Sequence, residues 1–260
     1  MNETFDILVI GGGINGAGIV RDASGRNLKV CLVEKNTVGS ATSSWSTKLI
    51  HGGLRYLENY EFRLVRESLK EREVIKKIAS NITTPLPFII PYQKSLRPKW
   101  LIKLGLFLYD NIGGKMTIPK SSTINIKREI PNILKDQFKI GFQYYDLQVD
   151  DKKLVQLNVE DAKKKGATII QNRKVIDAKR NKNTWDITLD DNTILQSKIL
   201  INAAGPWINE VLSNVIKLNS KKSIRLVKGS HIITKSLYSQ KKAFTLQNED
   251  NRIIFVIPYK

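Results

Sequence analysis

The chain has 260 residues, enough for one large or two modest domains with a buried core. Hydrophobic residues make up 41% and charged residues 26%, which is ordinary globular composition and excludes a disordered tail, a collagen and a disulfide scaffold. The single cysteine, Cys31, cannot form an internal bridge, so we expect a reducing compartment. No apolar run reaches the roughly 18 residues of a bilayer-spanning helix, and three glycines break the run Ile7 to Ile10, which therefore is not a signal peptide.

Basic residues outnumber acidic residues by 43 to 24, for a formal net charge of +19. Such a charge fits nucleic acid, an anionic membrane surface or an anionic substrate. Lysine outnumbers arginine, however, whereas proteins that read bases rely on arginine and aromatic stacking. We therefore predict solvated lysines scattered over the surface, as genome base composition produces, and no nucleic-acid partner.

The N-terminal segment is predicted to form a β-α-β unit. The apolar run Phe5 to Ile10 ends in glycine, the pattern of a buried parallel strand. Ile14 to Gly25 is predicted to be the following helix, and Lys29 to Val33 a second buried strand that ends at Glu34. A strand, a helix and a second strand in this order indicate an α/β fold.

The turn between the first strand and the helix carries the glycine spacing G-x-G-x-x-G. The first glycine allows a tight turn, the second lets the backbone approach a pyrophosphate, and the third lets the helix pack close to the strand. The helix N-terminus offers N–H groups to phosphates, and the Glu34 carboxylate can accept hydrogen bonds from an adenosine ribose. This pattern predicts a dinucleotide site rather than a glycine-rich turn beside a surface glutamate. Its turn residues are Gly11, Gly12, Gly13, Ile14, Asn15 and Gly16.

Residues 36–56 are rich in Gly, Ser and Thr and are predicted to form an extended loop. A nicotinamide enzyme has no need of such a loop here, whereas a long FAD must be gripped along its pyrophosphate and its ring. We therefore predict FAD, with a plain surface loop as the alternative. Lys48 is expected to contact FAD or substrate, or else to be solvated. The cofactor contacts predicted in the loop are Thr42, Ser43, Ser44, Lys48, Leu49, His51, Gly52 and Gly53.

Beyond the loop, the pattern changes to helices and short irregular stretches. Tyr60 to Ala79 has the spacing of an amphipathic helix. The four prolines between residues 85 and 98 predict an irregular stretch, and residues 111–145 are assigned to a second substructure. Residues 97–109 are apolar with basic flanks, so they are predicted either to lie on a membrane surface or to form an ordinary buried helix.

The second half of the chain contains further short elements. In chain order these are a helix at 151–165, a strand at 167–170, a hairpin of strands 184–189 and 193–195, a buried strand at 199–201 and a last strand at 253–257. The chain ends on that strand with nothing predicted to cover it, so we expect an incomplete domain.

Several short runs together carry a specific family pattern. They are Ile10–Gly18, Ala41–Ser44, Lys48–Leu57, Tyr60–Val65, Gly105–Asp110, Ala204–Trp207, Gly229–Ile232 and Leu246–Asp250. These runs resemble the aerobic, FAD-dependent glycerol-3-phosphate dehydrogenases, and the resemblance covers the whole chain. The small departures Val20 and Asn27 lie away from the phosphate loop. The large departure is length, because the family continues for as many residues again, so we expect an N-terminal half that is truncated at its C-terminus.

The resemblance implies FAD as cofactor and oxidation of sn-glycerol 3-phosphate to dihydroxyacetone phosphate. A hydride would pass from C2 to flavin N5, and the electrons would go on to a quinone. The protein would be cytoplasmic, attached peripherally to the inner face of the cytoplasmic membrane, and no metal site is predicted. The expected α/β architecture has a Rossmann-like FAD-binding domain in residues 1–75 and 146–212. A partial α+β substrate domain with an antiparallel sheet takes residues 76–145, which also face the membrane, and 213–260.

The resemblance also suggests roles for individual residues. A proton acceptor working near neutral pH suggests a histidine. His231 is the candidate base, or else a structural histidine, while His51 is expected to position the flavin ring or the substrate. Arg55 is the candidate for the substrate phosphate, because guanidinium makes charge-assisted contacts, with a structural salt bridge as the alternative. Val175 matches the place where the family's backbone meets adenine, and Gly205 lets the chain pass close to the cofactor.

Three functional hypotheses remain open at this point. The first is a glycerol-3-phosphate dehydrogenase polypeptide, either truncated or completed by a separate chain that carries the C-terminal half. The second is a non-catalytic remnant that binds FAD weakly or not at all. The third is a related FAD-dependent amino-acid or hydroxy-acid oxidase, against which the runs at 48–57 and 228–232 argue.

Overall fold

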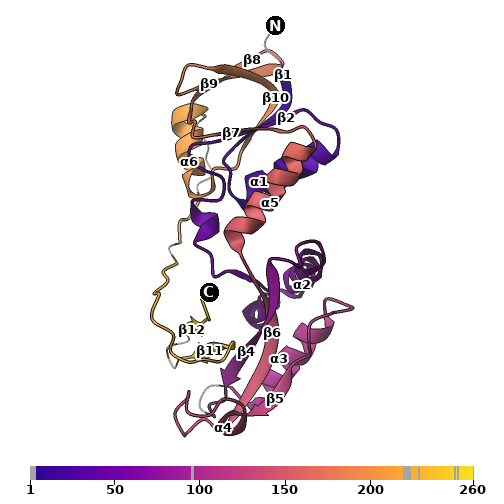
Figure 1. The fold of residues 1–260 in the computed structure, drawn as a ribbon, viewed down its shortest axis with the longest axis vertical. Helices are drawn as coiled ribbons and strands as arrows, with labels where there is room; N and C mark the ends of the chain where they lie inside the picture. Colours follow the sequence, from indigo (N-terminus) through magenta and orange to yellow (C-terminus); the bar gives the residue numbers. More distant parts are fainter. Residues whose placement is uncertain are drawn as a thin grey trace. The chain divides into compact units, whose positions relative to one another are not determined.

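The computed structural model divides the chain into two compact units, whose elements are drawn in Figure 1. Unit 1 takes residues 1–48 and 150–229, and unit 2 takes residues 49–149 and 230–260. The first boundary between the units lies after residue 48, whereas the sequence analysis placed it after residue 75. The residues that the structure describes are 4–94, 97–218, 224–227, 229–248, 250 and 252–259.

Unit 1 is built on a six-stranded sheet with the order β7-β2-β1-β10-β9-β8. The first four strands in this order are parallel, and β10, β9 and β8 continue as an antiparallel meander. Every residue of β2 is buried, as expected of a parallel strand that is covered on both faces. This sheet confirms the α/β class. The bounds are β1 (Thr4–Ile10), β2 (Val30–Glu34), β7 (Thr168–Gln171), β8 (Val175–Asn181), β9 (Thr184–Leu189) and β10 (Ile194–Asn202).

Helices cover both faces of this sheet. The helices α1 (Ile14–Gly25) and α5 (Asp151–Lys164) lie side by side (Figure 1) and pack their apolar stripes on the face that carries Val9 and Leu32. The opposite face packs against Val215 and its neighbours. That layer follows β10 and consists of η3 (Gly205–Trp207), α6 (Ile208–Glu210) and the π-helical η4 (Val211–Val215).

Unit 2 is built on a second sheet, with the order β12-β11-β4-β6-β3 and with β5 also paired to β6. Its pairs are antiparallel except that β11 runs parallel to β4. This sheet agrees with the predicted antiparallel sheet. The strands are β3 (Leu49–Ile50), β4 (Thr83–Pro91), β5 (Ser122–Asn125), β6 (Ile140–Val149), β11 (Ala243–Gln247) and β12 (Ile253–Val256).

The helices of unit 2 are η2 (Leu54–Asn59), α2 (Phe62–Ile78), α3 (Lys99–Asn111) and α4 (Ile126–Glu129). Val65 and Leu69 of α2 are fully buried in one core with Phe88 of β4 and Phe142 of β6. This packing explains why α2 belongs to unit 2, although in the sequence it directly follows the predicted extended loop.

Two local expectations were wrong. Pro85, Pro87 and Pro91 were assigned to an irregular stretch, but they lie inside β4, which pairs with β6 along its whole length. The three prolines share one parity, so all the missing N–H groups lie on one edge of the strand and the other edge keeps its donors. The separate strands expected at 193–195 and 199–201 form a single strand, β10.

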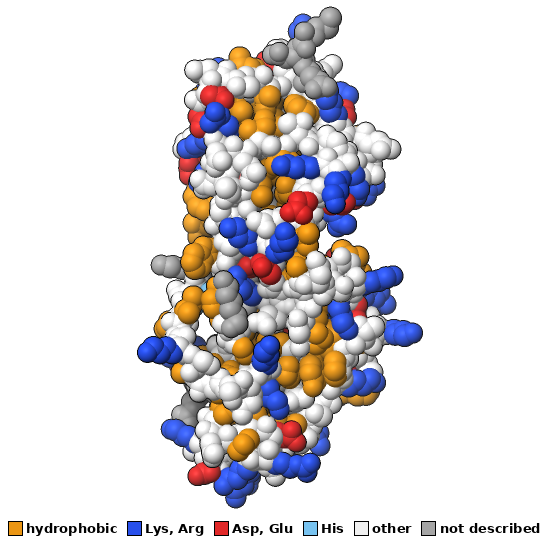
Figure 2. All heavy atoms as spheres, viewed as in Figure 1, with side chains coloured by type: hydrophobic (Ala, Val, Ile, Leu, Met, Phe, Trp, Pro, Cys, Tyr) orange, Lys and Arg blue, Asp and Glu red, His pale blue; other side chains and the backbone are white. Residues whose placement is uncertain are grey.

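The surface shows how the basic charge is distributed. In Figure 2, Lys and Arg side chains are spread over the face in view rather than gathered into one patch, and hydrophobic side chains gather over α3. The exposed apolar residues of that helix include Trp100 and Phe107, which are 65% and 63% exposed. Among the described residues, no helix has the length and apolar character needed to cross a bilayer.

Candidate functional site

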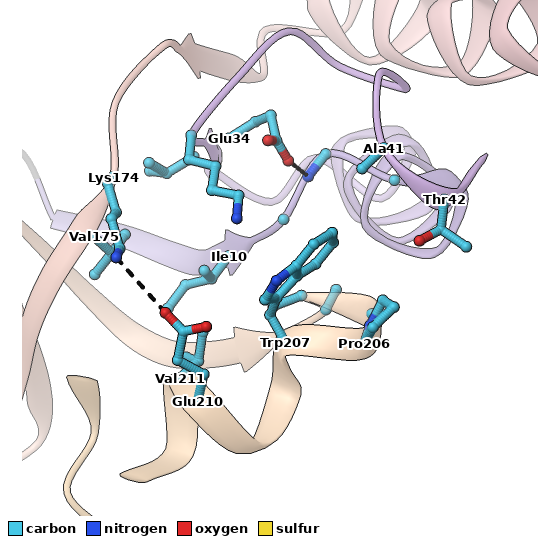
Figure 3. Close-up of a pocket in the computed structure, with 18 of the residues that line it drawn as sticks. Ile10, Glu34, Ala41, Thr42, Lys174, Val175, Pro206, Trp207, Glu210 and Val211 are labelled. Atoms are coloured by element: carbon cyan, nitrogen blue, oxygen red, sulfur yellow. Dashed lines mark hydrogen bonds and ion pairs between the residues drawn. The ribbon is translucent and has the colours of Figure 1, made fainter. Parts of the chain in front are cut away.

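A cavity of about 350 Å³ lies in unit 1 at the carboxyl end of β1 (Figure 3). Strand β1 stands between β2 and β10 and is parallel to both, so the carboxyl ends of the three strands lie at the same edge of the sheet. Open α/β sheets bind their ligands at such a point. The predicted cofactor residues that line the cavity are Gly11, Gly12, Gly13, Ile14, Asn15, Glu34, Thr42, Ser43, Val175 and Gly205.

The glycines of the first turn are required by close backbone approach. Gly11 has φ +109°, and a Cβ there would lie 2.5 Å from the carbonyl oxygen of Ala203 at the end of β10. A Cβ on Gly16 would collide with the carbonyl oxygen of Gly11, so α1 can approach β1 this closely only with glycine. A Cβ on Gly12 would lie 2.9 Å from the Cβ of Glu34. Gly11, Gly12 and Gly13 also line the cavity, so the backbone of this tight turn lies where a pyrophosphate could approach it.

Glu34 is held in place at the end of β2 by backbone donors. The Gly12 amide donates to Oε2 at 2.6 Å, a bond drawn in Figure 3, and the Asn36 amide donates to Oε1 at 2.9 Å. Both bonds come from the backbone, so the carboxylate is fixed while still lining the cavity. This is the position from which a carboxylate accepts hydrogen bonds from a ribose.

The hydroxyl-rich segment η1 (Thr42–Ser44) lies against the start of α1. The Ile14 amide donates to Ser43 Oγ at 3.0 Å, so Ser43 caps one of the helix amides that have no partner within the helix. Thr42 lines the cavity. The Ser44 hydroxyl instead donates to the carbonyl of Ala41 at 3.0 Å and stabilises the turn itself.

Lys48 lies at the end of unit 1, with its ammonium on Asp151. The distance from Nζ to Oδ1 is 2.6 Å, and the Ser46 hydroxyl donates to the other oxygen of Asp151 at 2.7 Å. Burial raises the pKa of Asp151, but the hydrogen bonds from Lys48 and Ser46 outweigh burial, so the net pKa lies below its ordinary value. This ion pair joins two points where the chain passes between units.

Several residues of the cavity were missed by the sequence analysis. Lys35 places its Nζ 4.2 Å from the centroid of the Trp207 ring, a cation–π contact at the mouth of the cavity. Lys174 and Glu210 also line the cavity and form an ion pair at 3.7 Å, drawn as a dashed line in Figure 3. A signal was available, because Lys35 directly follows β2 and Trp207 lies just after β10, at the edge of the sheet where the glycine turn lies.

The other predicted residues of the flavin loop belong to unit 2. Leu49 pairs with Gln148 of β6, and its side chain packs against the core. The Gly52 amide donates to the Tyr109 hydroxyl at 2.7 Å. Gly53, the residue before η2, has φ +71°, a conformation that L side chains rarely adopt. The structure thus forms a tight turn here, whose backbone is buried at both glycines.

The three candidates for substrate chemistry have exposed side chains. They are His51 and Arg55, on the two sides of the glycine pair, and His231 in an irregular segment of unit 2. Lys228, which precedes His231 in the family run, is outside the described residues. The structure therefore gathers most of the predicted unit 1 residues around one cavity, which Gly16, Ser44 and Lys48 do not line, and it groups His51 and Arg55 on one turn of unit 2.

The arrangement in unit 1 fits a dinucleotide. A turn in which added side chains would collide, a helix N-terminus and a fixed carboxylate are the three parts that such a ligand needs. The sequence matches the family described as FAD dependent oxidoreductase over residues 6–260. The chain belongs to this family. FAD is therefore its cofactor, as the sequence analysis predicted.

The relatives also confirm the predicted resemblance. A D-erythritol 1-phosphate dehydrogenase of Brucella abortus is 48% identical over 99% of this chain and 53% of its own length. The aerobic glycerol-3-phosphate dehydrogenase of Escherichia coli is 45% identical over 99% of this chain and 52% of its own. The structure of a Bacillus halodurans glycerol-3-phosphate dehydrogenase complexed with FAD has TM-score 0.68 and 26% identity, over 99% of this chain and 46% of that one. The chain thus spans about half the length of the curated relatives it matches.

Proposed function

We propose that this chain supplies the FAD-binding part of an enzyme that oxidises a polyol phosphate. The substrate is sn-glycerol 3-phosphate, the product is dihydroxyacetone phosphate, and the electrons go to a quinone. The observation that carries this proposal is the glycine turn with Glu34 fixed beside it, in a chain related to glycerol-3-phosphate dehydrogenases.

The unit 1 residues hold the cofactor. The turn from Gly11 to Gly16 and the start of α1 receive the pyrophosphate, where backbone amides and the helix dipole favour negative charge. Glu34 accepts hydrogen bonds from the adenosine ribose, and Thr42 and Ser43 offer hydroxyls nearby. Val175 contributes backbone to the adenine, because its side chain is buried in the core, and Gly205 lets the chain pass close by.

The substrate-side residues belong to unit 2. Bound FAD supplies the two-electron acceptor for the hydride that leaves C2 of the substrate. His231 takes the hydroxyl proton, which balances the loss of hydride and leaves the ketone. Arg55 binds the phosphate, and His51 positions the ring or the substrate. Along the chain, the cofactor residues of unit 1 are connected to the substrate-side residues of unit 2 by a segment that contains Lys48, Leu49, Gly52 and Gly53.

D-erythritol 1-phosphate is the second candidate substrate, because the Brucella abortus relative that bears its name is as similar to this chain as the glycerol-3-phosphate dehydrogenases are. Both candidates are polyol phosphates, so one set of groups for proton, hydride and phosphate serves either. The difference between them is the length of the polyol.

Helix α3 is proposed to rest on the inner face of the cytoplasmic membrane. Its exposed Trp100, Leu104 and Phe107 alternate with Lys99 and Lys103, the composition of a helix at an anionic interface. The proposal predicts that the protein sediments with vesicles containing an anionic lipid and that Phe107→Glu abolishes this. Sedimentation that is unchanged in the variant would contradict it.

The main experiment is the visible spectrum of the purified, FAD-loaded chain without oxygen. We expect the flavin absorbance to bleach on addition of glycerol 3-phosphate or D-erythritol 1-phosphate, and the faster of the two identifies the substrate. Glycerol, which lacks the phosphate, is the control and should not bleach it. A soluble quinone should restore the colour. A chain that binds flavin but is bleached by neither phosphate would overturn the proposed activity and leave the family assignment intact.

A further inference from the structure

A buried polar network in unit 2 ends at the Gly52 amide. The Tyr109 hydroxyl donates to Asp146 Oδ1 at 2.7 Å and accepts from the Gly52 N–H at 2.7 Å. Arg72 Nη1 donates to the same Asp146 oxygen at 2.7 Å. A guanidinium, a carboxylate, a hydroxyl and a backbone amide thus form one continuous chain from α2 through β6 and α3 to the turn after β3.

This network stands in an apolar core. Tyr109, Arg72 and Asp146 are 1%, 3% and 4% exposed, and the side chains around them include Leu106 and Phe142. A buried ion pair contributes little net stability compared with apolar residues of the same shape, because desolvation offsets the attraction. Its geometry therefore has another consequence, which is to fix the direction of every hydrogen bond in the chain.

The direction of the Tyr109 bond follows from its surroundings. Burial, with the nearby Asp146 charge, raises the pKa of Tyr109 well above its ordinary value, so the hydroxyl keeps its proton. Burial also raises the pKa of Asp146, but the Arg72 charge and the Tyr109 hydrogen bond act against that rise. Since the Tyr109 proton goes to Asp146, its oxygen is left to accept from Gly52.

The turn held in this way carries two of the candidate site residues. A Cβ on Gly52 would collide with Leu69 and lie 2.9 Å from the Tyr109 ring, so the backbone is pressed against the core at this residue. His51 and Arg55, close to Gly52 along the chain, have exposed side chains. The inner side of the turn is therefore anchored, and its outer side presents an imidazole and a guanidinium.

We propose that Tyr109, oriented by Asp146 and Arg72, is a positioning residue that holds the Gly52 turn so that His51 and Arg55 meet the polyol phosphate. This inference rests on the proposed function for the identity of the ligand, but the anchoring itself does not depend on it. Tyr109 touches neither substrate nor cofactor in this role, and it acts through the backbone of Gly52.

The test compares Tyr109→Phe with Tyr144→Phe. Tyr144 is also buried, packs edge-on against Tyr109 at 6.0 Å between ring centroids, and bonds through its hydroxyl to Thr245 rather than to the turn. Each variant loses one buried hydroxyl from the same core, so a general loss of stability affects both. Only Tyr109→Phe removes the acceptor of the Gly52 amide.

The first readout is hydrogen exchange at the Gly52 amide in the purified chain. We expect exchange at least ten times faster in Tyr109→Phe and within twofold of the parent in Tyr144→Phe. The second readout is the FAD-loaded protein with glycerol 3-phosphate, where the limiting rate of flavin bleaching should fall about tenfold in Tyr109→Phe alone. The FAD dissociation constant should stay within twofold of the parent value in both variants, whereas general structural damage would raise it.

Equal exchange at Gly52 in the two variants overturns the anchoring. Faster exchange in Tyr109→Phe with an unchanged bleaching rate overturns the link to the substrate. If the parent chain is bleached by neither polyol phosphate, the proposed function has failed, and the exchange comparison still decides whether Tyr109 holds the turn.

Discussion

The two units treat a buried carboxylate in opposite ways. In unit 1, Glu34 accepts hydrogen bonds only from the backbone amides of Gly12 and Asn36, and among the described residues no lysine or arginine forms an ion pair with it. In unit 2, Asp146 is closed off by the Arg72 guanidinium and the Tyr109 hydroxyl. Glu34 lines a cavity, whereas Asp146 lies inside a core.

This difference distinguishes a carboxylate that is available to bind a ligand from one that only stabilises the fold. A carboxylate that is oriented by amides but has no countercharge keeps its capacity to accept hydrogen bonds from a ligand. A carboxylate that is paired and enclosed has used that capacity within the protein, and its loss leaves a buried positive charge. Substitution of Glu34 should therefore change binding more than stability, and substitution of Asp146 should change stability more than binding.

The largest effect is expected from Asp146→Ala. It removes the short 2.7 Å partner of the buried Arg72 guanidinium and leaves that charge only the longer 3.7 Å contact with Glu73 and the Tyr145 carbonyl, so the free energy of unfolding should fall by about 3–5 kcal/mol. Glu34→Ala, in which the cavity lets water reach the two amides, should cost about 1–2 kcal/mol. Urea titration of both variants measures the difference. Equal losses would remove the distinction between the two carboxylates.

The next effect concerns the glycine turn of unit 1. Gly16→Ala places a methyl group against the Gly11 carbonyl, which neither backbone can avoid, so we expect a loss of about 3 kcal/mol and of measurable FAD binding. Gly18→Ala on the same helix meets nothing within 4 Å and should stabilise the protein by about 0.5–1 kcal/mol. Thermal unfolding and flavin fluorescence report the two quantities. A tolerated Gly16→Ala would mean that α1 does not approach β1 as closely as described.

The glycine turn was also the part of the site that the sequence predicted best. A strand, a turn with fixed glycine spacing, a helix and a second strand ending in Glu34 are all local, so hydrophobic periodicity and steric rules reach them. The prolines of β4 show the opposite case. In the local sequence, Pro85 and Pro87 predict an interruption of the strand. Only the pairing with β6, more than 50 residues away in the chain, shows that one edge of β4 keeps its N–H donors.

Contacts through space mark the limit of the sequence analysis. Nothing near Tyr109 in the chain indicates that it meets Gly52 and Asp146, because β6 and the turn after β3 are brought to it by the sheet of unit 2. Lys35 and Trp207 meet for the same reason at the edge of the other sheet. Sequence patterns thus located the glycine turn of unit 1, but not the contacts that Tyr109 makes in unit 2 or that Lys35 makes with Trp207 in unit 1.

A smaller effect is expected from Glu34→Gln, which tests whether the charge of the Glu34 carboxylate contributes to FAD binding. The amide can accept one of the two backbone N–H groups, but its own N–H₂ then faces the other, and its hydrogen bonds to a ribose lose their charge. We expect the FAD dissociation constant to rise about tenfold, or about 1.4 kcal/mol. Glu210→Gln, at the same cavity but paired with Lys174, is the control and should change it less than twofold. Equal changes would assign the effect to cavity charge rather than to Glu34.

The smallest effect tests the ion pair between Lys48 and Asp151, which is intermediate between the two carboxylates because it is partly buried. Lys48→Met should lower the free energy of unfolding by about 1 kcal/mol at pH 7, and Lys165→Met, which breaks an exposed pair with Asp161, by about half of that or less. The pKa of Asp151 in the folded protein lies below its ordinary 3.8, so the pair stabilises the protein above that pH and the stabilisation disappears as the pH falls below it.

Denaturant titrations of the parent and of Lys48→Met between pH 7 and pH 3 should therefore converge only at the acid end of the series. The same variant also tests the predicted cofactor contact of Lys48. Because its ammonium already lies on Asp151, we expect the FAD dissociation constant to change less than threefold. A tenfold loss of FAD affinity with no change in the free energy of unfolding would instead show that Lys48 leaves Asp151 for the cofactor. Lys48 would then be a cofactor-binding residue rather than one that stabilises the fold.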